Sequence, residues 1–131
     1  MKIVILSDSP TIPTGYRNQA TQLARALIKQ GHEVHYLGNG YMGSTISHMK
    51  LEGGEEFNYT IYGHSQNDPY FSNSMAQTIK KLNADRFIIL LDTFMLFPWF
   101  INVDTAPAKT FFWFPTDGGG GLPKGCEVIL Q

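Results

Sequence analysis

The sequence has little cysteine and little charge. Its single cysteine, Cys126, rules out an internal disulfide framework and a metal site built from several cysteines, and it is compatible with a reducing compartment. Charged residues make up 16% of the chain, the net charge is −1, and no basic stripe is present. Nucleic-acid binding depends on clustered Lys and Arg side chains, so we expect no nucleic-acid partner.

Long apolar runs are also missing. The apolar run at residues 3–6 is too short for the hydrophobic region of a signal peptide. The most apolar stretch, residues 87–91, is far below the ~20 residues that a membrane-spanning helix needs. The sequence therefore predicts a soluble, cytoplasmic protein.

Several catalytic and cofactor motifs are absent as well. The chain contains no H-E-x-x-H pair, no Walker A sequence and no G-x-S-x-G nucleophile elbow. Gly15 has no partner glycines at the G-x-G-x-x-G spacing, and residues 37–39 carry no acid for a ribose hydroxyl. We therefore expect no metal and no cofactor, and a nicotinamide-dependent dehydrogenase is disfavoured.

A strand–helix–strand unit is present at the start of the chain. Residues 2–7 form a β-branched apolar run typical of a strand buried on both faces. Two prolines in the loop at 8–15 prevent helix formation there, and an amphipathic helix is predicted from about Tyr16. Gly31 stands where a left-handed C-cap belongs, and residues 33–38 form the next strand. This pattern predicts one right-handed β-α-β unit.

The middle of the chain is less regular. Residues 39–56 are polar and rich in glycine, which predicts a long surface loop with a short hairpin around 52–55. Residues 57–63 alternate and predict a strand. A second helix is predicted from Ser72 or Asn73 to Leu82, followed by Asn83 as its C-cap.

The last part returns to strands. Residues 86–92 are the most hydrophobic strand and should be central in the sheet, and residues 109–114 and 127–130 predict two more. The alternation of strands and helices predicts an α/β fold: a Rossmann-like, doubly wound, mainly parallel sheet between two helix layers. We expect residues 1–131 to be a single domain, truncated from a larger two-domain enzyme because the strand–helix rhythm stops abruptly.

Candidate site residues follow from this topology. Asp8, Asp92 and Asp117 each follow a predicted strand, and the carboxyl ends of parallel strands form one edge where ligands bind. Thr14 and Gly15 precede the first helix, whose free N–H groups favour an anion or a ligand hydroxyl. Short polar residues are also ordinary turn formers, and Thr14 is equally explained as an N-cap.

Two further features fall at the same predicted edge. His64 follows a strand and is a candidate general base or a partner for a sugar hydroxyl. Gly118 and Gly119 open a run of four glycines that would let the backbone approach a ligand closely or form an anion-binding nest. The alternative interpretation of the glycine run is a flexible loop.

Several segments of the chain resemble one enzyme family. The segments are residues 13–19 (PTGYRNQ), the helix that follows, residues 31–34 (GHEV) and residues 114–118 (FPTDG) with a Leu-Pro at 122–123. Together they are similar to the N-terminal domain of group 1 (family 4) glycosyltransferases of the GT-B fold. The sequence departs from the family at Arg17, where a second glycine is common. It also departs between residues 118 and 126, where a helix is often found.

The resemblance implies a function. GT-B enzymes pair two Rossmann-like domains across a cleft, so this chain would receive the acceptor and a missing C-terminal domain would hold the sugar nucleotide. Thr14, Gly15 and Tyr16 would line the cleft, with Asp92 and Asp117 facing the acceptor or the sugar. The partners implied are a nucleotide-sugar donor and a carbohydrate or lipid-linked acceptor, and the fragment alone would be inactive. Exposed aromatic residues of segment 94–100 would stack on a sugar or make a peripheral contact with a membrane or protein, although core packing is the commoner fate of such residues.

Two other classes remain open at this point. Residues 11–18 are also similar to the hydroxyl-containing phosphate loop of a flavodoxin-like module that binds FMN, although Pro13 and Arg17 interrupt the pattern. A receiver-type regulatory domain would use Asp92 as a phosphoacceptor, but only Asp8 stands where such domains carry paired acids.

Overall fold

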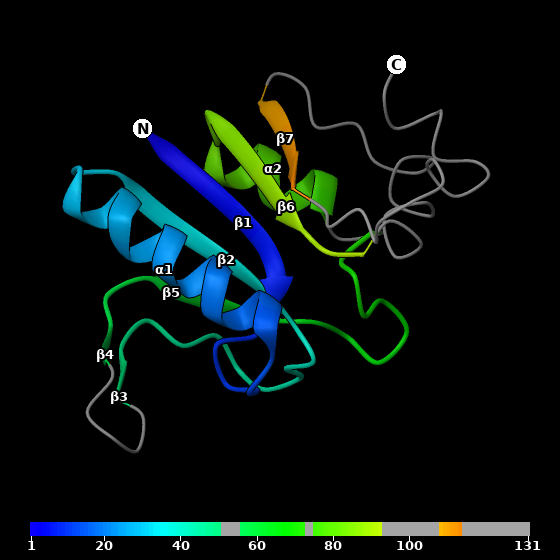
Figure 1. The fold of residues 1–131 in the computed structure, drawn as a ribbon. Helices are drawn as coiled ribbons and strands as arrows, with labels where there is room; N and C mark the ends of the chain where they lie inside the picture. Colours follow the sequence, from blue (N-terminus) through cyan, green and yellow to red (C-terminus); the bar gives the residue numbers. More distant parts are fainter. Residues whose placement is uncertain (51–55, 73–74, 93–107, 114–131) are drawn as a thin grey trace, which may run out of the picture.

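The computed structural model describes residues 1–50, 56–72, 75–92 and 108–113, and they form a five-stranded parallel sheet with helices on its two faces (Figure 1). The sheet order is β5-β2-β1-β6-β7, and every neighbouring pair is parallel. The strands are β1 (Lys2–Asp8), β2 (Glu33–Asn39), β5 (Thr60–Gly63), β6 (Arg86–Leu90) and β7 (Lys109–Trp113).

The strand order identifies the class of α/β fold. Numbered along the chain, the sheet strands run third, second, first, fourth, fifth, which is the order of the Rossmann fold. The predicted Rossmann-like, parallel sheet is therefore confirmed in the part of the chain that the structure describes. Flavodoxin and receiver domains have the order second, first, third, fourth, fifth instead. The topological switch point lies between β1 and β6, where the connections diverge to the two sides of the sheet.

The first β-α-β unit forms as predicted, with small shifts at its ends. Helix α1 spans Gly15–Lys29, and Thr14 is its N-cap, with the hydroxyl accepting from the Arg17 amide. Gly31 has φ +87°, the left-handed conformation that lets the chain turn out of the helix into β2.

Side chains from alternate positions of β1 enter two separate cores. Ile3 and Ile5 pack on the α1 side with Ala20 and Ala24. On the other side, Val4 and Leu6 pack with Phe87 of β6 and with α2 (Met75–Leu82), whose Ile79 is buried. Burial on both faces explains why β1 reads as a continuous apolar run, and it produces the three layers seen in Figure 1.

The later elements agree with the predictions in part. The described part of α2 begins at Met75, and residues 73–74, where its predicted start falls, lie outside the described residues. Asn83 follows the helix with φ +50°, as expected of its C-cap. Strand β6 ends at Leu90 and lies inside the sheet, but the middle strand is β1. The aromatic segment 93–101 and the predicted strand 127–130 lie outside the described residues.

The predicted strand at 57–63 is divided between two sheets. The predicted hairpin is present as β3 (Met49–Lys50) and β4 (Glu56–Phe57), which pair antiparallel, while its turn at 51–55 lies outside the described residues. Because residues 56–57 pair with β3, β5 starts only at Thr60 and joins β2 in the main sheet.

Tyr36 leads to a prediction about alkaline unfolding. Its ring is fully buried, its hydroxyl donates to the Asp8 carbonyl oxygen at 2.6 Å, and burial raises its pKa far above the usual value. Burial also raises the pKa of Tyr62, by less. The folded state therefore holds these phenolic protons more tightly than the unfolded chain does, so stability is fully present below about pH 10 and falls as pH rises beyond it.

Urea titrations at several pH values test this. Tyr36→Phe should cost about 1 kcal/mol at pH 7, because one buried hydrogen bond is lost. The same variant should remove most of the decline above pH 10, whereas Tyr41→Phe, at a tyrosine that is only half-buried, should leave that decline unchanged. Equal alkaline slopes for the wild type and Tyr36→Phe would contradict the assignment.

Candidate functional site

The candidate site lies at the carboxyl edge of the sheet, around the switch point between β1 and β6. Asp8 ends β1, and Asp92 follows β6 by two residues. The first turn of α1 begins at the same edge, directly after the loop at residues 9–14. The parallel sheet thus brings together five of the predicted site residues: Asp8, Thr14, Gly15, Tyr16 and Asp92.

The Asp8 carboxylate is held by Thr14. The Thr14 hydroxyl donates to Asp8 Oδ2 at 2.7 Å and accepts from the Arg17 amide at 3.1 Å. Both hydrogen-bonding functions of this hydroxyl are therefore used inside the protein, which confirms the interpretation of Thr14 as an N-cap. Within the described ranges, Asp8 Oδ1 accepts no hydrogen bond.

The Asp92 carboxylate is held in the same way by Tyr16. The Tyr16 hydroxyl, from the first turn of α1, donates to Asp92 Oδ1. This bond joins residues 76 positions apart and crosses the switch point from the helix to the end of β6. Both residues are half-buried, and no other hydrogen bond reaches the Asp92 carboxylate from the described residues.

Three further side chains hold the backbone in place at this edge of the sheet. Ser7 donates to the Leu90 carbonyl oxygen at 2.8 Å, which ties β1 to the end of β6, and Tyr36 holds the Asp8 carbonyl oxygen as described above. Arg17 reaches back from α1 and donates through Nε to the Pro10 carbonyl oxygen at 3.1 Å. These three residues were not among the predicted site residues. For Ser7 and Tyr36, the sequence signal is a hydroxyl group within an otherwise apolar strand.

Two glycines shape the space above this edge. A Cβ added to Gly15 would meet no described atom within 4 Å, so the first turn of α1 is open to a ligand. A Cβ added to Gly38 would lie 3.0 Å from Ser9 Cβ, which explains why β2 needs glycine where the loop after β1 crosses it.

His64 lies apart from the two carboxylates. It follows β5, which is three strand spacings, or about 14 Å, from β6. Its Nδ1 donates to the Ser65 carbonyl oxygen at 2.8 Å, which leaves Nε2 as the nitrogen able to accept a proton. Its ring packs edge-on against Phe71, 6.1 Å between ring centroids. No described contact joins His64 to Asp92. Asp117, Gly118 and Gly119 lie outside the described residues.

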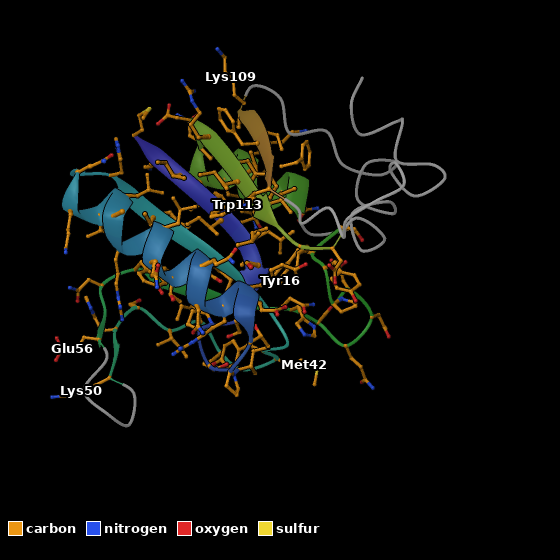
Figure 2. All side chains as sticks on the ribbon, viewed as in Figure 1. Tyr16, Met42, Lys50, Glu56, Lys109 and Trp113 are labelled. Carbon is orange, nitrogen blue, oxygen red and sulfur yellow. The ribbon has the colours of Figure 1, made fainter. Side chains whose placement is uncertain are left out.

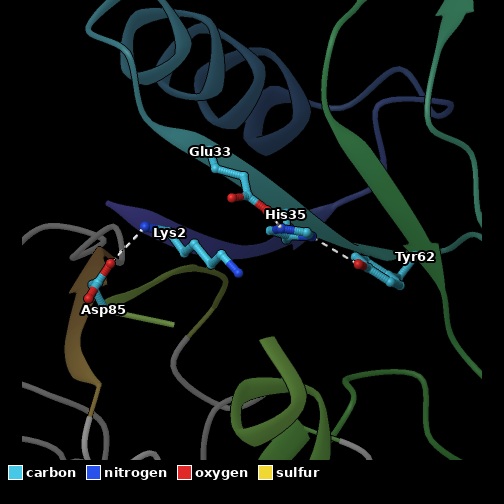
Figure 3. Close-up of polar contacts among 5 residues, drawn as sticks. All are labelled: Lys2, Glu33, His35, Tyr62 and Asp85. Carbon is cyan, nitrogen blue, oxygen red and sulfur yellow. Dashed lines mark hydrogen bonds and ion pairs between the residues drawn. The ribbon is translucent and has the colours of Figure 1, made fainter. Parts of the chain in front are cut away.

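The opposite, amino-terminal edge carries a different set of polar contacts (Figure 3). His35 bonds the Glu33 carboxylate at 2.8 Å through Nε2 and the Tyr62 hydroxyl at 2.9 Å through Nδ1. The bond from His35 lowers the pKa of Glu33. Asp85 Oδ2 accepts from the Lys2 amide at 2.8 Å and so ties the start of β6 to β1. Two of these contacts, His35–Tyr62 and Lys2–Asp85, join neighbouring strands, so we interpret this edge as structural.

The chemistry at the candidate site is that of paired hydrogen-bond acceptors. Two carboxylates each have one oxygen bonded to a protein hydroxyl, while the other oxygen accepts no hydrogen bond from the described residues, and they lie beside a helix N-terminus. Among the described residues, no group of three or more His, Cys, Asp or Glu side chains is placed to hold a metal ion. Negative charge on both sides disfavours a phosphate group here and favours a ligand that donates hydrogen bonds through hydroxyls.

Comparisons with known proteins add no family to this description. In the described ranges, no helix is long and apolar enough to cross a membrane. No protein-family model matches the chain, and no curated protein matches it in sequence. The similarity to GT-B glycosyltransferases therefore rests on the short motifs around α1 and at residues 114–123.

Proposed function

We propose that this chain is the N-terminal, acceptor-side domain of a cytoplasmic glycosyltransferase that moves a sugar from a nucleotide-sugar donor to a carbohydrate or lipid-linked acceptor. The observation that supports this most is the pair of hydroxyl-held carboxylates at the switch point, Thr14–Asp8 and Tyr16–Asp92. Sugar hydroxyls are strong hydrogen-bond donors, and carboxylates are the side chains best able to accept from several of them.

Within this proposal Asp92 has the central role. Its open oxygen would accept the proton of the acceptor hydroxyl, or orient that hydroxyl toward the donor sugar. Tyr16 holds the other oxygen, so the carboxylate is fixed before the acceptor binds. Asp8 would accept from a neighbouring hydroxyl of the same acceptor. The proposal also includes four residues that only the sequence suggests: His64, Asp117, Gly118 and Gly119. A closed two-domain enzyme would bring these groups to the reaction.

The donor would be held elsewhere. The carboxylates on this edge repel a pyrophosphate, so the sugar nucleotide is assigned to a second domain that faces the α1 N-terminus across a cleft. The family resemblance implies the same arrangement, with the acceptor bound by this chain and the donor bound by the second domain. The isolated chain would therefore be inactive.

The strand order argues against the two alternatives. FMN modules of the flavodoxin type and receiver domains share an order in which the first strand lies between the second and the third. Here the first strand lies between the second and the fourth, so neither alternative is favoured by a structural observation.

Amide NMR of the isotopically labelled chain tests the proposal. We expect a panel of methyl glycosides to shift the amides of Gly15, Tyr16 and Asp92, with weak affinity in the millimolar range typical of small ligands held by a few hydrogen bonds. FMN should produce no shifts, and UDP-glucose should not be turned over by these 131 residues. A yellow complex with FMN, or shifts confined to residues distant from the α1 N-terminus, would contradict the acceptor-site assignment.

A further inference from the structure

A cavity of about 210 Å³ lies at the amino-terminal edge of the sheet, beside the last turn of α1. The end of α1 and the start of β2 form one side of it, and the stretches before β3 and after β4 form the other. A smaller cavity of about 120 Å³ shares Ile28, Asn58 and Tyr59 with it, so the two adjoin. Figure 2 shows Glu56, which lines the smaller cavity, well away from Tyr16 of the candidate site.

Four polar side chains of the larger cavity can bind a ligand: Ser47, His48, Asn58 and Thr60. In the part of the chain that the structure describes, none of these four side chains makes a hydrogen bond. Hydroxyl, amide and neutral imidazole groups can each both donate and accept, so the cavity offers both functions from several directions. Such partners suit a ligand that carries several groups able to do both, as hydroxyls are.

The fixed charge on the cavity wall is negative. Glu33 is the one carboxylate among the described lining residues, and no lysine or arginine is among them. His35 donates to Glu33 Oε1 at 2.8 Å and lowers the pKa of this carboxyl, so it is ionised at neutral pH. Its Oε2 accepts no hydrogen bond from a described residue. A phosphate or carboxylate would be repelled here, whereas a hydroxyl could donate to the carboxylate.

Apolar groups complete the cavity. Ile28 lies at the end of α1, and Val34 and Tyr59 are buried beside it. A sugar ring has C–H groups on its faces and hydroxyls around its rim, so one molecule can contact both the apolar and the polar side chains. A mainly apolar wall with a few polar groups that fix orientation is the usual composition of a small-molecule site.

We infer that this cavity is a second binding site of the chain, and that its ligand is a neutral sugar. The mixed donors and acceptors, the single carboxylate and the apolar wall each match one feature of that ligand. Helix α1 has 15 residues and is therefore about 22 Å long, which separates this site from the one at its N-terminal end. No residue of the candidate site lines the cavity, so the inference does not depend on the proposed function.

Amide NMR titrations at pH 8, where imidazoles usually carry no charge, test the ligand class. Methyl glucoside should shift the amide signals of Glu33, Asn58 and Thr60, with a Kd in the millimolar range. Glucose 6-phosphate should bind about fivefold more weakly or worse, because the Glu33 carboxylate repels its phosphate. Glu33→Gln should bring the two Kd values within about twofold of each other.

Asn58→Ala should weaken the binding of methyl glucoside by about three- to tenfold, because the hydrogen bonds of one side chain are lost. Asn67→Ala is the matched control, since it removes another exposed asparagine side chain that does not line the cavity, and it should have no effect. Both side chains are exposed, so both variants should fold. Tighter binding of glucose 6-phosphate than of methyl glucoside, or equal Kd values for the two alanine variants, overturns the inference.

The same titration separates this inference from the proposed function. Shifts at Gly15, Tyr16 and Asp92 alone would support the acceptor site and overturn the second site. Shifts at Asn58 and Thr60 alone would support the second site and contradict the acceptor-site assignment. No shift at either group of residues overturns both.

Discussion

Phe87→Ala is expected to lower the free energy of unfolding by about 3–5 kcal/mol, the largest stability loss that we predict for one substitution. Phe87 lies in β6 with none of its surface exposed, and it packs with Val4, Leu6 and Ile79 between the sheet and α2. Removing the ring leaves a cavity between two layers that cannot collapse without moving β6. Since domains are typically stable by 5–15 kcal/mol, the variant should be close to unfolding at room temperature.

Urea unfolding followed by circular dichroism at low protein concentration measures this loss. Phe111→Ala is the matched control, because it makes the same chemical change on the neighbouring strand at a ring that is 52% exposed, and it should cost less than 1 kcal/mol. If Phe87→Ala does not fold, Phe87→Leu should still fold and cost about 1 kcal/mol. Similar losses for the two alanine variants would mean that the α2 side of the sheet is not a packed core.

The first β-α-β unit could be predicted almost residue by residue because its signals are local. The period of the apolar side chains, the N-cap at Thr14 and the left-handed glycine at Gly31 all act within one turn of the chain. The same holds for the C-cap at Asn83. In each case the residue that sets a helix end lies next to that end in the sequence.

The predictions that failed depend on partners distant in sequence. Residues 57–63 alternate like one strand, but β4 pairs with β3 and only Thr60–Gly63 joins the main sheet. No pattern within the segment could reveal this division, because it depends on where residues 49–50 lie. The strand order is likewise invisible to periodicity, and it places β1 rather than the more hydrophobic β6 in the middle of the sheet.

The candidate site shows the same division between local and distant information. A parallel sheet requires the strand ends to share one edge, so the approach of Asp8, Thr14 and Asp92 could be expected from topology alone. The Tyr16–Asp92 bond could not, since it requires β6 to lie directly beside β1. The same strand order puts His64 on the far side of β2, although its position after a strand is equivalent to that of Asp92.

Asp92→Asn is the second prediction with a large effect. If the chain serves the proposed transfer reaction, this variant should lower kcat/KM for glycosyl transfer by the natural full-length protein by about 10²–10⁴-fold, the usual contribution of a general base. The asparagine keeps the size of the side chain and an oxygen to accept from Tyr16, so the unfolding free energy should change little. A large loss of activity with an unchanged fold therefore reports on the negative charge itself.

Asp85→Asn provides the control, because Asp85 precedes the same strand at its opposite end and its contact is with the Lys2 amide (Figure 3). It should leave transfer within about twofold of the wild type, as expected of a substitution distant from the reacting groups. Tyr16→Phe should fall between the two variants, since the carboxylate remains but its orientation is no longer fixed by the hydroxyl. Full activity in Asp92→Asn would remove Asp92 from the reaction and leave Asp8 as the only described carboxylate at the switch point to carry it.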